Sequence, residues 1–277
     1  MTRPVAKHTI VNGNQVYYEL YTNPSSSHTL VLIHGFLSSS FSYRRMIPFL
    51  IHEFNILSVD LPPFGKSGKE IHYKYSYENL AQTVLQLTKE EHIHEFSVVG
   101  HSMGGQISLH IMRQAPERVH KGILLCSSSY MKRAKKRLIY SSFIPYFHLY
   151  VKLWLARSGV RSNLQNVVYN QTLIDDEMMF GYLQPFLEDD IFRALTRMIR
   201  DREGDLEEKA LKEIRTPCLL IWGEHDRVVP LRTGKKLHQD LPNSKLVVLK
   251  EAGHLVSEEK PKEVADYMKE FIYGQKS

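Results

Sequence analysis

Short apolar runs alternate with segments of helical periodicity along most of the chain. Several runs are apolar on successive residues, which is typical of parallel strands covered on both faces. The segments between them repeat apolar positions at intervals of three and four residues, as amphipathic helices do. This order of elements predicts an α/β fold. The predicted strands cover residues 29–33, 55–59, 96–99, 122–126, 218–222 and 245–249.

Local signals mark the boundaries of several elements. The dipeptide Asn12-Gly13 readily takes the positive φ angles of a tight hairpin, so two short strands are predicted across residues 8–20. Ser76 stands where it can cap a helix with a regular apolar stripe, and Pro261 suits the first turn of a helix at the carboxyl end. These signals place helices on both sides of the predicted strands in the chain.

The alternation of strands and helices stops between about residues 128 and 211. This segment is helical in composition, rich in large apolar side chains and free of any convincing central strand. It is therefore predicted to be an inserted helical cap, or lid, of residues 128–211. The α/β core is then formed by residues 1–127 and 212–277.

Composition agrees with a soluble globular protein of 277 residues, of which 43% are hydrophobic and 24% charged. The amino terminus has no apolar block like that of a signal peptide, and no window resembles a membrane span, so a cytoplasmic location is expected. Cys126 and Cys218 each lie within an apolar run, which favours buried free thiols over a disulfide.

The formal net charge of +6 comes from one segment. Between Tyr130 and Ile174 there are eight basic residues and no acidic one, which leaves the rest of the chain close to neutral. No nucleic-acid-binding motif accompanies the charge, so a nucleic-acid partner is not expected. Two interpretations remain open: a solvated face, or peripheral contact of basic and aromatic side chains with an anionic membrane surface. The basic residues are Lys132, Arg133, Lys135, Lys136, Arg137, Lys152, Arg157 and Arg161.

The sequence GHSMG at residues 100–104 fits the pattern G-x-S-x-G between a predicted strand and a predicted helix. A serine on so sharp a turn takes a strained backbone, and Gly100 and Gly104 remove collisions with the neighbouring elements; Gly105 is expected to help. Ser102 is therefore the candidate nucleophile. The amide of Met103 lies at a helix amino terminus, where it would favour a developing negative charge.

A serine nucleophile needs a base, and the base needs a carboxylate to orient it. His254 and Asp226 each follow a predicted strand, and the carboxyl ends of parallel strands meet at one edge of a sheet. The order Ser, Asp, His supports this choice. Glu224 is the alternative carboxylate, but Asp226 sits further into its turn and is favoured. His225 is expected to be a neighbour of the site and not a base.

The run Ile33-His34-Gly35-Phe36-Leu37 follows the strand at residues 29–33. A glycine there lets the backbone approach a substrate closely, so the amide of Phe36 is the expected second donor of an oxyanion hole beside Met103. Gly35, Leu37 and His101 are expected to lie along the substrate, with His101 a structural neighbour and not a base.

Together these motifs resemble those of the α/β-hydrolase fold enzymes across nearly the whole chain. The segments that carry the resemblance are HGF, DLPPFGKS, GHSMGG, WGEHDRVVP and GHLVSEEKP. The resemblance implies an eight-stranded, mainly parallel sheet, a lid after the sixth strand, and a mechanism without a metal or other cofactor. It also implies a triad of Ser102, Asp226 and His254 with the amides of Phe36 and Met103 facing the oxyanion.

Two comparisons within that family refine the expectation. Family members often have glycine where Pro63 stands, a difference that concerns only the shape of one loop. Epoxide hydrolases and haloalkane dehalogenases of the same fold have an aspartate at the nucleophile position, and Ser102 argues against both.

The expected function is hydrolysis of a carboxylic ester or similar acyl bond through an acyl-enzyme, as in a carboxylesterase or small-lipid esterase. The part of the cap between Tyr130 and Ile174, which is aromatic and has no acidic residue, suggests a small acyl substrate that is apolar or aromatic. Two alternatives remain: a carbon–carbon bond hydrolase or lyase acting on a ketone, and a binding module that holds a small ligand without converting it. The acyl and alcohol groups and the oligomeric state are left open.

Overall fold

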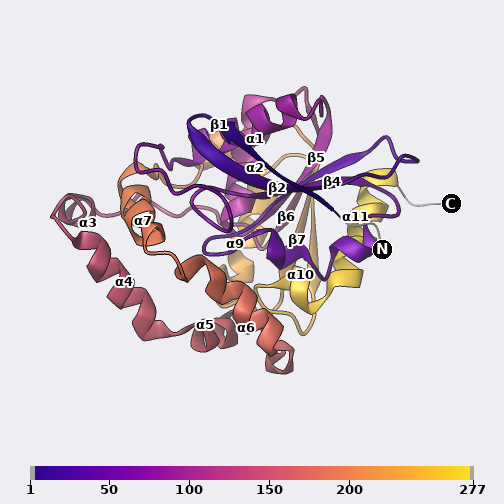
Figure 1. Ribbon diagram of the computed structural model, residues 1–277. Helices are drawn as coiled ribbons and strands as arrows, with labels where there is room; N and C mark the ends of the chain where they lie inside the picture. The colour runs from indigo at the N-terminus through magenta and orange to yellow at the C-terminus, as the bar shows by residue number, and fades with distance from the viewer. Residues whose placement is uncertain (1–3, 275–277) are drawn as a thin grey trace.

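The computed structural model describes residues 4–274, and an eight-stranded sheet forms their centre (Figure 1). The strand order is β1-β2-β4-β3-β5-β6-β7-β8, parallel from β4 to β8 with an antiparallel hairpin of β1 and β2 at one edge. The predicted α/β fold is therefore confirmed. The strands are β1 Val5–Val11, β2 Asn14–Tyr21, β3 Thr29–Ile33, β4 Asn55–Asp60, β5 Phe96–His101, β6 Val119–Leu125, β7 Cys218–Gly223 and β8 Ser244–Leu249.

The predicted boundary signals act as expected. Asn12 and Gly13 both have positive φ, 51° and 75°, and join β1 to β2 in a tight hairpin. The Ser76 hydroxyl accepts a hydrogen bond from the amide of Asn79 at 3.2 Å, and Pro261 begins the last helix. The helices of the core are α1 Tyr77–Glu90, α2 Met103–Gln114, α8 Glu208–Lys212, α9 Leu231–Asp240, α10 Val256–Glu259 and α11 Pro261–Tyr273.

Helices cover both faces of the sheet. α1 and α2 pack against each other and α2 packs on β5, whereas α11 packs against β7 and a short 3-10 helix, η2 (Ile47–Phe49). Cys126 and Cys218 are buried free thiols in this core, as the apolar runs predicted. Within residues 4–274, no helix is both long and apolar enough to cross a membrane.

Between β6 and β7 the chain forms helices and no strand within the described residues. The helices before α8 make an arm along one side of the molecule, away from the chain ends (Figure 1). The predicted boundary between residues 211 and 212 falls within α8. Residues 1–3 and 275–277, which the prediction assigned to the core, lie outside the described residues. The helices of the arm are α3 Lys136–Ser141, α4 Phe147–Ser158, α5 Val160–Val167, η3 Gln171–Leu173, α6 Asp176–Leu183, η4 Gln184–Phe186 and α7 Asp190–Asp201.

Candidate active site

Ser102 lies on the sharp turn between β5 and α2. Its φ of 53° and ψ of −118° are strained for a residue with a side chain. A Cβ atom at Gly100 would lie 2.3 Å from the carbonyl oxygen of Gly104, and one at Gly104 would lie 2.1 Å from that of Ile33. The two glycines therefore let β5, α2 and β3 approach closely enough to form the turn.

The loop after β3 lies directly against this turn. A Cβ atom at Gly35 would lie 3.2 Å from Cβ of Ser102, so glycine allows the backbone to reach the serine. Among the described residues, neither the amide of Phe36 nor that of Met103 has a hydrogen-bond acceptor. Both amides are thus available to an oxyanion beside Ser102. Leu37 has a φ of 53° and packs against the hydrophobic core.

His254 and Asp226 form a buried pair. Nδ1 of His254 donates to Oδ2 of Asp226 at 2.7 Å, and the other carboxylate oxygen accepts from the amides of Val228 and Val229 at 2.8 and 2.9 Å. With Oδ1 held by two backbone amides, the carboxylate has a fixed orientation. A proton on Nδ1 leaves Nε2 of His254 as the basic nitrogen.

The alternative carboxylate is elsewhere. Glu224 is exposed and lies near its neighbour His225, 3.7 Å from Nε2. The ring of His225 stacks on Tyr169 with 4.5 Å between centroids. The structure therefore brings Asp226, and not Glu224, to the candidate base.

Ser102 follows His101, which contacts His254 of this pair; no hydrogen bond between the Ser102 hydroxyl and His254 is found among the described residues. The ring of the preceding residue, His101, lies 4.7 Å from that of His254 between centroids. Hydrogen bonds between a nucleophile and its base are often long without substrate and shorten in the complex. The structure thus joins Asp226 to His254 and places His101, the residue before Ser102, against His254, at the carboxyl ends of β5, β7 and β8. The complete triad with Ser102 stays a prediction.

His101 packs against the ring of His254 and bonds its backbone carbonyl. Burial, together with the nearby His254, lowers the pKa of His101 to about 3, so its ring is neutral at physiological pH. Its Nε2 lies 2.9 Å from the carbonyl oxygen of His254 and donates to it. His101 is not among the side chains that line the pocket described below, and its expected contact with substrate stays a prediction.

His34 holds the loop after β3, which carries Gly35. Its Nδ1 lies 2.7 Å from the carbonyl oxygen of Gly35, and its Nε2 accepts from the amide of Leu61 at 2.9 Å. Burial lowers the pKa of His34, which keeps the ring neutral with one donor and one acceptor nitrogen. Its role in holding the Gly35 loop was not predicted from the sequence.

The arm of helices also holds the His254 loop, by contacts that sequence reasoning missed. The amide of His254 donates to the carbonyl of Val167 at 2.7 Å. The Glu259 carboxylate accepts from the amides of Gly253, Tyr169 and Asn170 at 2.8, 2.7 and 3.1 Å. One side chain thus joins the loop of the candidate base to the segment after α5.

Cys126 lies beside the Asp226–His254 pair, and possible ligand atoms of the three residues lie within 4.8 Å of one another. Burial raises the pKa of the Cys126 thiol, so it stays protonated. Because Asp226 is already bonded to His254 and to two amides, the cluster offers a cation no free charged ligand. It fits a proton-transfer pair better than a metal site.

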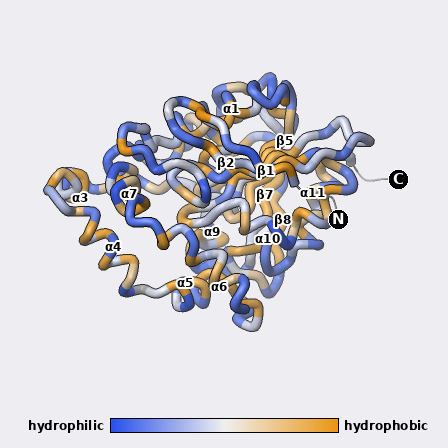
Figure 2. The backbone as a smooth tube through the Cα atoms, in the orientation of Figure 1, coloured by the Kyte–Doolittle hydropathy of each residue, from blue (hydrophilic) through white to orange (hydrophobic). Residues whose placement is uncertain are grey.

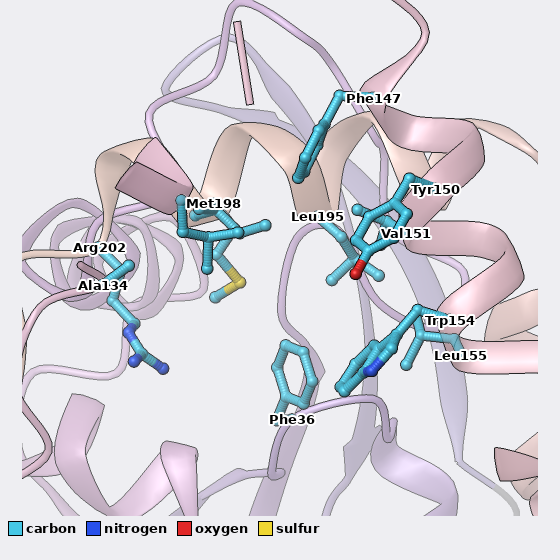
Figure 3. A pocket seen from close by; sticks show the side chains of 12 residues that line it. Phe36, Ala134, Phe147, Tyr150, Val151, Trp154, Leu155, Leu195, Met198 and Arg202 are labelled. Atoms are coloured by element: carbon cyan, nitrogen blue, oxygen red, sulfur yellow. The ribbon is translucent and has the colours of Figure 1, made fainter. Parts of the chain in front are cut away.

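An apolar pocket of about 370 Å³ lies between the arm and Phe36 of the core (Figure 3). Phe36 contributes both the amide expected to face the oxyanion and an aromatic side chain of the pocket wall. Arg202 is the one charged side chain that lines the pocket within the described residues. The other lining residues are Ala134, Leu138, Phe147, Tyr150, Val151, Trp154, Leu155, Leu195, Met198 and Ile199.

Comparison with known proteins agrees with this fold. A family model described as alpha/beta hydrolase fold matches residues 28–261, and the chain belongs to this family of hydrolases. It is 51% identical over 269 residues to the uncharacterized hydrolase YugF of Bacillus subtilis, covering 97% of this chain and 98% of that protein.

Two further similarities involve enzymes whose names state a substrate. The chain is 26% identical over 257 residues to 2-hydroxy-6-oxononadienedioate/2-hydroxy-6-oxononatrienedioate hydrolase of Paraburkholderia phymatum, covering 87% and 86% of the two chains. Its fold matches that of 2-hydroxy-6-oxo-6-phenylhexa-2,4-dienoate hydrolase from Rhodococcus with a TM-score of 0.82 at 22% identity, covering 99% and 100%. At that identity the second similarity shows the fold alone.

Proposed function

We propose that the protein is a serine hydrolase that cleaves a carboxylic ester or similar acyl bond through Ser102, His254 and Asp226. The observation that carries the proposal is the 2.7 Å bond between Nδ1 of His254 and the buried Asp226 carboxylate. This bond fixes the tautomer in which Nε2 can take a proton. The strained turn at Ser102 and the nearby Gly35 loop supply the nucleophile and the oxyanion donors.

The mechanism follows from these positions. The Ser102 oxygen attacks the ester carbonyl carbon while its proton passes to Nε2 of His254, and the amides of Phe36 and Met103 stabilise the resulting oxyanion. When the tetrahedral intermediate collapses, the carbon–oxygen bond breaks and the leaving alcohol takes the proton from His254. Water then attacks the acyl-enzyme with the same histidine as base, and the acid product and free Ser102 are released.

The pocket indicates which acyl group would be accepted. Its wall is formed by aliphatic and aromatic side chains, and its core end is Phe36, the residue after Gly35. An apolar acyl chain or an aromatic ring bound there would lose its contact with water, and its carbonyl would be near Ser102. The preferred substrate is therefore an ester of an apolar acid.

The test is hydrolysis of p-nitrophenyl butyrate together with labelling by a fluorophosphonate. Ser102→Ala should lose turnover and labelling. Ser108→Ala is the matched control, because this serine lies on α2, the helix that follows Ser102, and its hydroxyl donates to the carbonyl of Gly104 within the helix. Retained turnover in purified Ser102→Ala protein would exclude the proposed nucleophile.

A second candidate, carbon–carbon bond cleavage of a ketone that carries a carboxylate, is favoured by one feature. Arg202 is a cation in an otherwise apolar wall, and it would pair with such a carboxylate. The 26% identical relative is named for a substrate of this kind. A panel of esters and dienoate ketones separates the two reactions by their kcat/KM values. If neither class is converted and the fluorophosphonate does not react, the protein is a binding module.

A further inference from the structure

The arm and the segment before it expose many large apolar side chains. Of the 22 large apolar side chains that are exposed among the described residues, ten lie between Met131 and Trp154. We call residues 131–157 the cap surface. So many exposed apolar side chains within one short segment mark a surface that something covers.

Helix α4 shows the imbalance most clearly. Only one stripe of it packs on the rest of the molecule, with Val151 buried and Phe147 and Leu155 half-buried. Its remaining faces still carry Leu149, Tyr150, Leu153 and Trp154, and Trp154 is 63% exposed. Hydrophobic positions recur along the whole helix at the edge of the molecule (Figure 2). Apart from His148, Lys152 and Arg157, the helix is apolar at most positions, and a helix this apolar is otherwise found buried in protein or lipid.

The charge of the cap surface indicates what kind of partner covers it. Residues 131–157 hold seven basic side chains and no acidic one. Within the part of the chain that the structure describes, Lys152 is the one member of the set paired with a carboxylate, that of Asp189. A second copy of the chain would bring two such positive surfaces together, which like-charge repulsion opposes. A lipid bilayer with anionic headgroups and an apolar interior matches both the positive charge and the exposed apolar side chains of the cap surface.

A recess beside the exposed aromatic residues adds further positive charge. Arg193, Arg197 and Arg200 line a cavity of about 370 Å³ together with Phe143 and Tyr146. Asp201 pairs with one of these arginines, Arg197, at 2.9 Å. The recess therefore keeps a net positive lining, which suits a phosphate group next to an apolar chain.

From these features we infer that the cap surface docks the protein on anionic lipid bilayers. The apolar side chains of α4 enter the boundary between headgroups and acyl chains, and the basic residues contact the headgroups. Tyr150 and Trp154 belong both to this surface and to the lining of the apolar pocket. If the proposed ester function holds, docking brings the pocket wall formed by these two residues to the lipid, so an apolar substrate enters directly from the bilayer.

The test uses flotation with vesicles of phosphatidylcholine alone or containing about 30% phosphatidylglycerol. The Ser102→Ala protein serves for every binding measurement, so docking is measured whether or not the protein is an esterase. We expect flotation with the anionic vesicles only, and at least about tenfold weaker partitioning in 0.5 M salt because screening weakens the headgroup contacts.

Leu149→Glu/Leu153→Glu places two acids on α4 outside the pocket lining and should weaken partitioning by about tenfold or more. The matched control is Val5→Glu/Ile10→Glu, which makes the same kind of change at exposed positions 56% and 74% accessible on β1. This control should bind as the parent does. Equal loss in both variants would overturn the inference.

Tryptophan emission gives an independent signal. The chain has two tryptophans, and Trp222 is fully buried, so a blue shift on adding anionic vesicles reports Trp154. Trp154→Phe should remove the shift. If the parent neither floats nor shifts at low salt, the inference is wrong. If sedimentation instead shows a dimer that Leu149→Glu/Leu153→Glu dissociates, without vesicle binding, a second copy is the occupant.

Discussion

The backbone amide of His254 donates a hydrogen bond to the backbone carbonyl of Val167, 2.7 Å away. Val167 ends helix α5 of the arm, whereas His254 belongs to the loop after β8. The loop that carries the candidate base is therefore held from outside the core. A change in the arm near α5 would alter the position of His254 without touching Ser102.

Glu259 provides the side-chain part of this connection, and its substitution tests it. In the parent protein, three backbone amides donate to the Glu259 carboxylate. In Glu259→Gln an NH₂ group replaces one carboxylate oxygen, so at least one of these amides loses its acceptor. We expect kcat for p-nitrophenyl butyrate to fall about tenfold, equivalent to about 1.4 kcal/mol, as His254 loses its alignment. KM should change by less than about twofold, because the pocket is intact.

Glu263→Gln, an exposed change on α11, is the matched control and should leave both constants unchanged. A fall in kcat that is matched by a lower thermal midpoint, and that disappears when rates are corrected for folded protein, would show that Glu259 only stabilises the fold.

The choice between two carboxylates gives a second prediction. In Asp226→Asn the amide oxygen can keep the bonds from Val228 and Val229, but the NH₂ group then faces Nδ1 of His254 and favours the wrong tautomer. Turnover should fall by about 10³ to 10⁴ with little change in stability. Glu224→Gln should retain wild-type turnover. If Glu224→Gln is the more damaging of the two, the assignment of Asp226 is wrong.

The sequence predicted the elements well where an apolar run lies in the middle of the sheet. The run at residues 29–33 coincides with β3, whereas the strand predicted at residues 122–126 is β6, Val119–Leu125. β6 begins earlier because hydrogen bonding to β5 starts at Val119, although the following His120 and Lys121 are polar. Ladder bonds involve the backbone, so side-chain patterns locate strand ends poorly.

The same reason limits prediction of the site. Ser102, Asp226 and His254 were found because each follows a strand in a short motif, and the structure confirms that Asp226 meets His254. Val167 contributes only its backbone carbonyl. Every residue has this group, so the sequence carries no signal for the contact. Glu259 is preceded by Glu258, which pairs with arginines 44 and 45 instead, and no sequence signal separates the two acids.

The glycines of the nucleophile turn make a prediction about stability. A methyl group at residue 104 would lie 2.1 Å from the carbonyl oxygen of Ile33, a backbone atom that cannot move without shifting β3. Gly104→Ala should lower the free energy of unfolding by at least about 3 kcal/mol. Gly13→Ala, where a Cβ atom meets nothing within 4 Å, should cost only about 1 to 2 kcal/mol from its positive φ. Similar losses in urea titrations of both variants would contradict this account.

The apolar pocket predicts a dependence on acyl chain length. Trp154→Ala removes one wall of the pocket, so kcat/KM for p-nitrophenyl octanoate should fall about tenfold while that for the acetate stays unchanged. Tyr140→Ala is the control, because this aromatic side chain is exposed on α3 and does not line the pocket. Assays are made without lipid. An equal loss for both esters would mean that acyl chains bind elsewhere.

The buried His101 predicts how stability responds to acid. Its pKa is lowered from 6.5 to about 3 in the folded protein, so between these values the unfolded chain binds a proton that the native state does not. Its contribution to stability is therefore present above about pH 6.5 and is lost as the pH falls toward 3, at up to about 1.4 kcal/mol per pH unit. His101→Gln keeps a donor for the carbonyl of His254 but does not titrate, so urea unfolding between pH 7 and pH 4 should show a shallower loss of stability than in the parent. His120→Gln, at an exposed histidine, should follow the parent. Parallel curves for His101→Gln and the parent would mean that burial of His101 does not govern the acid response.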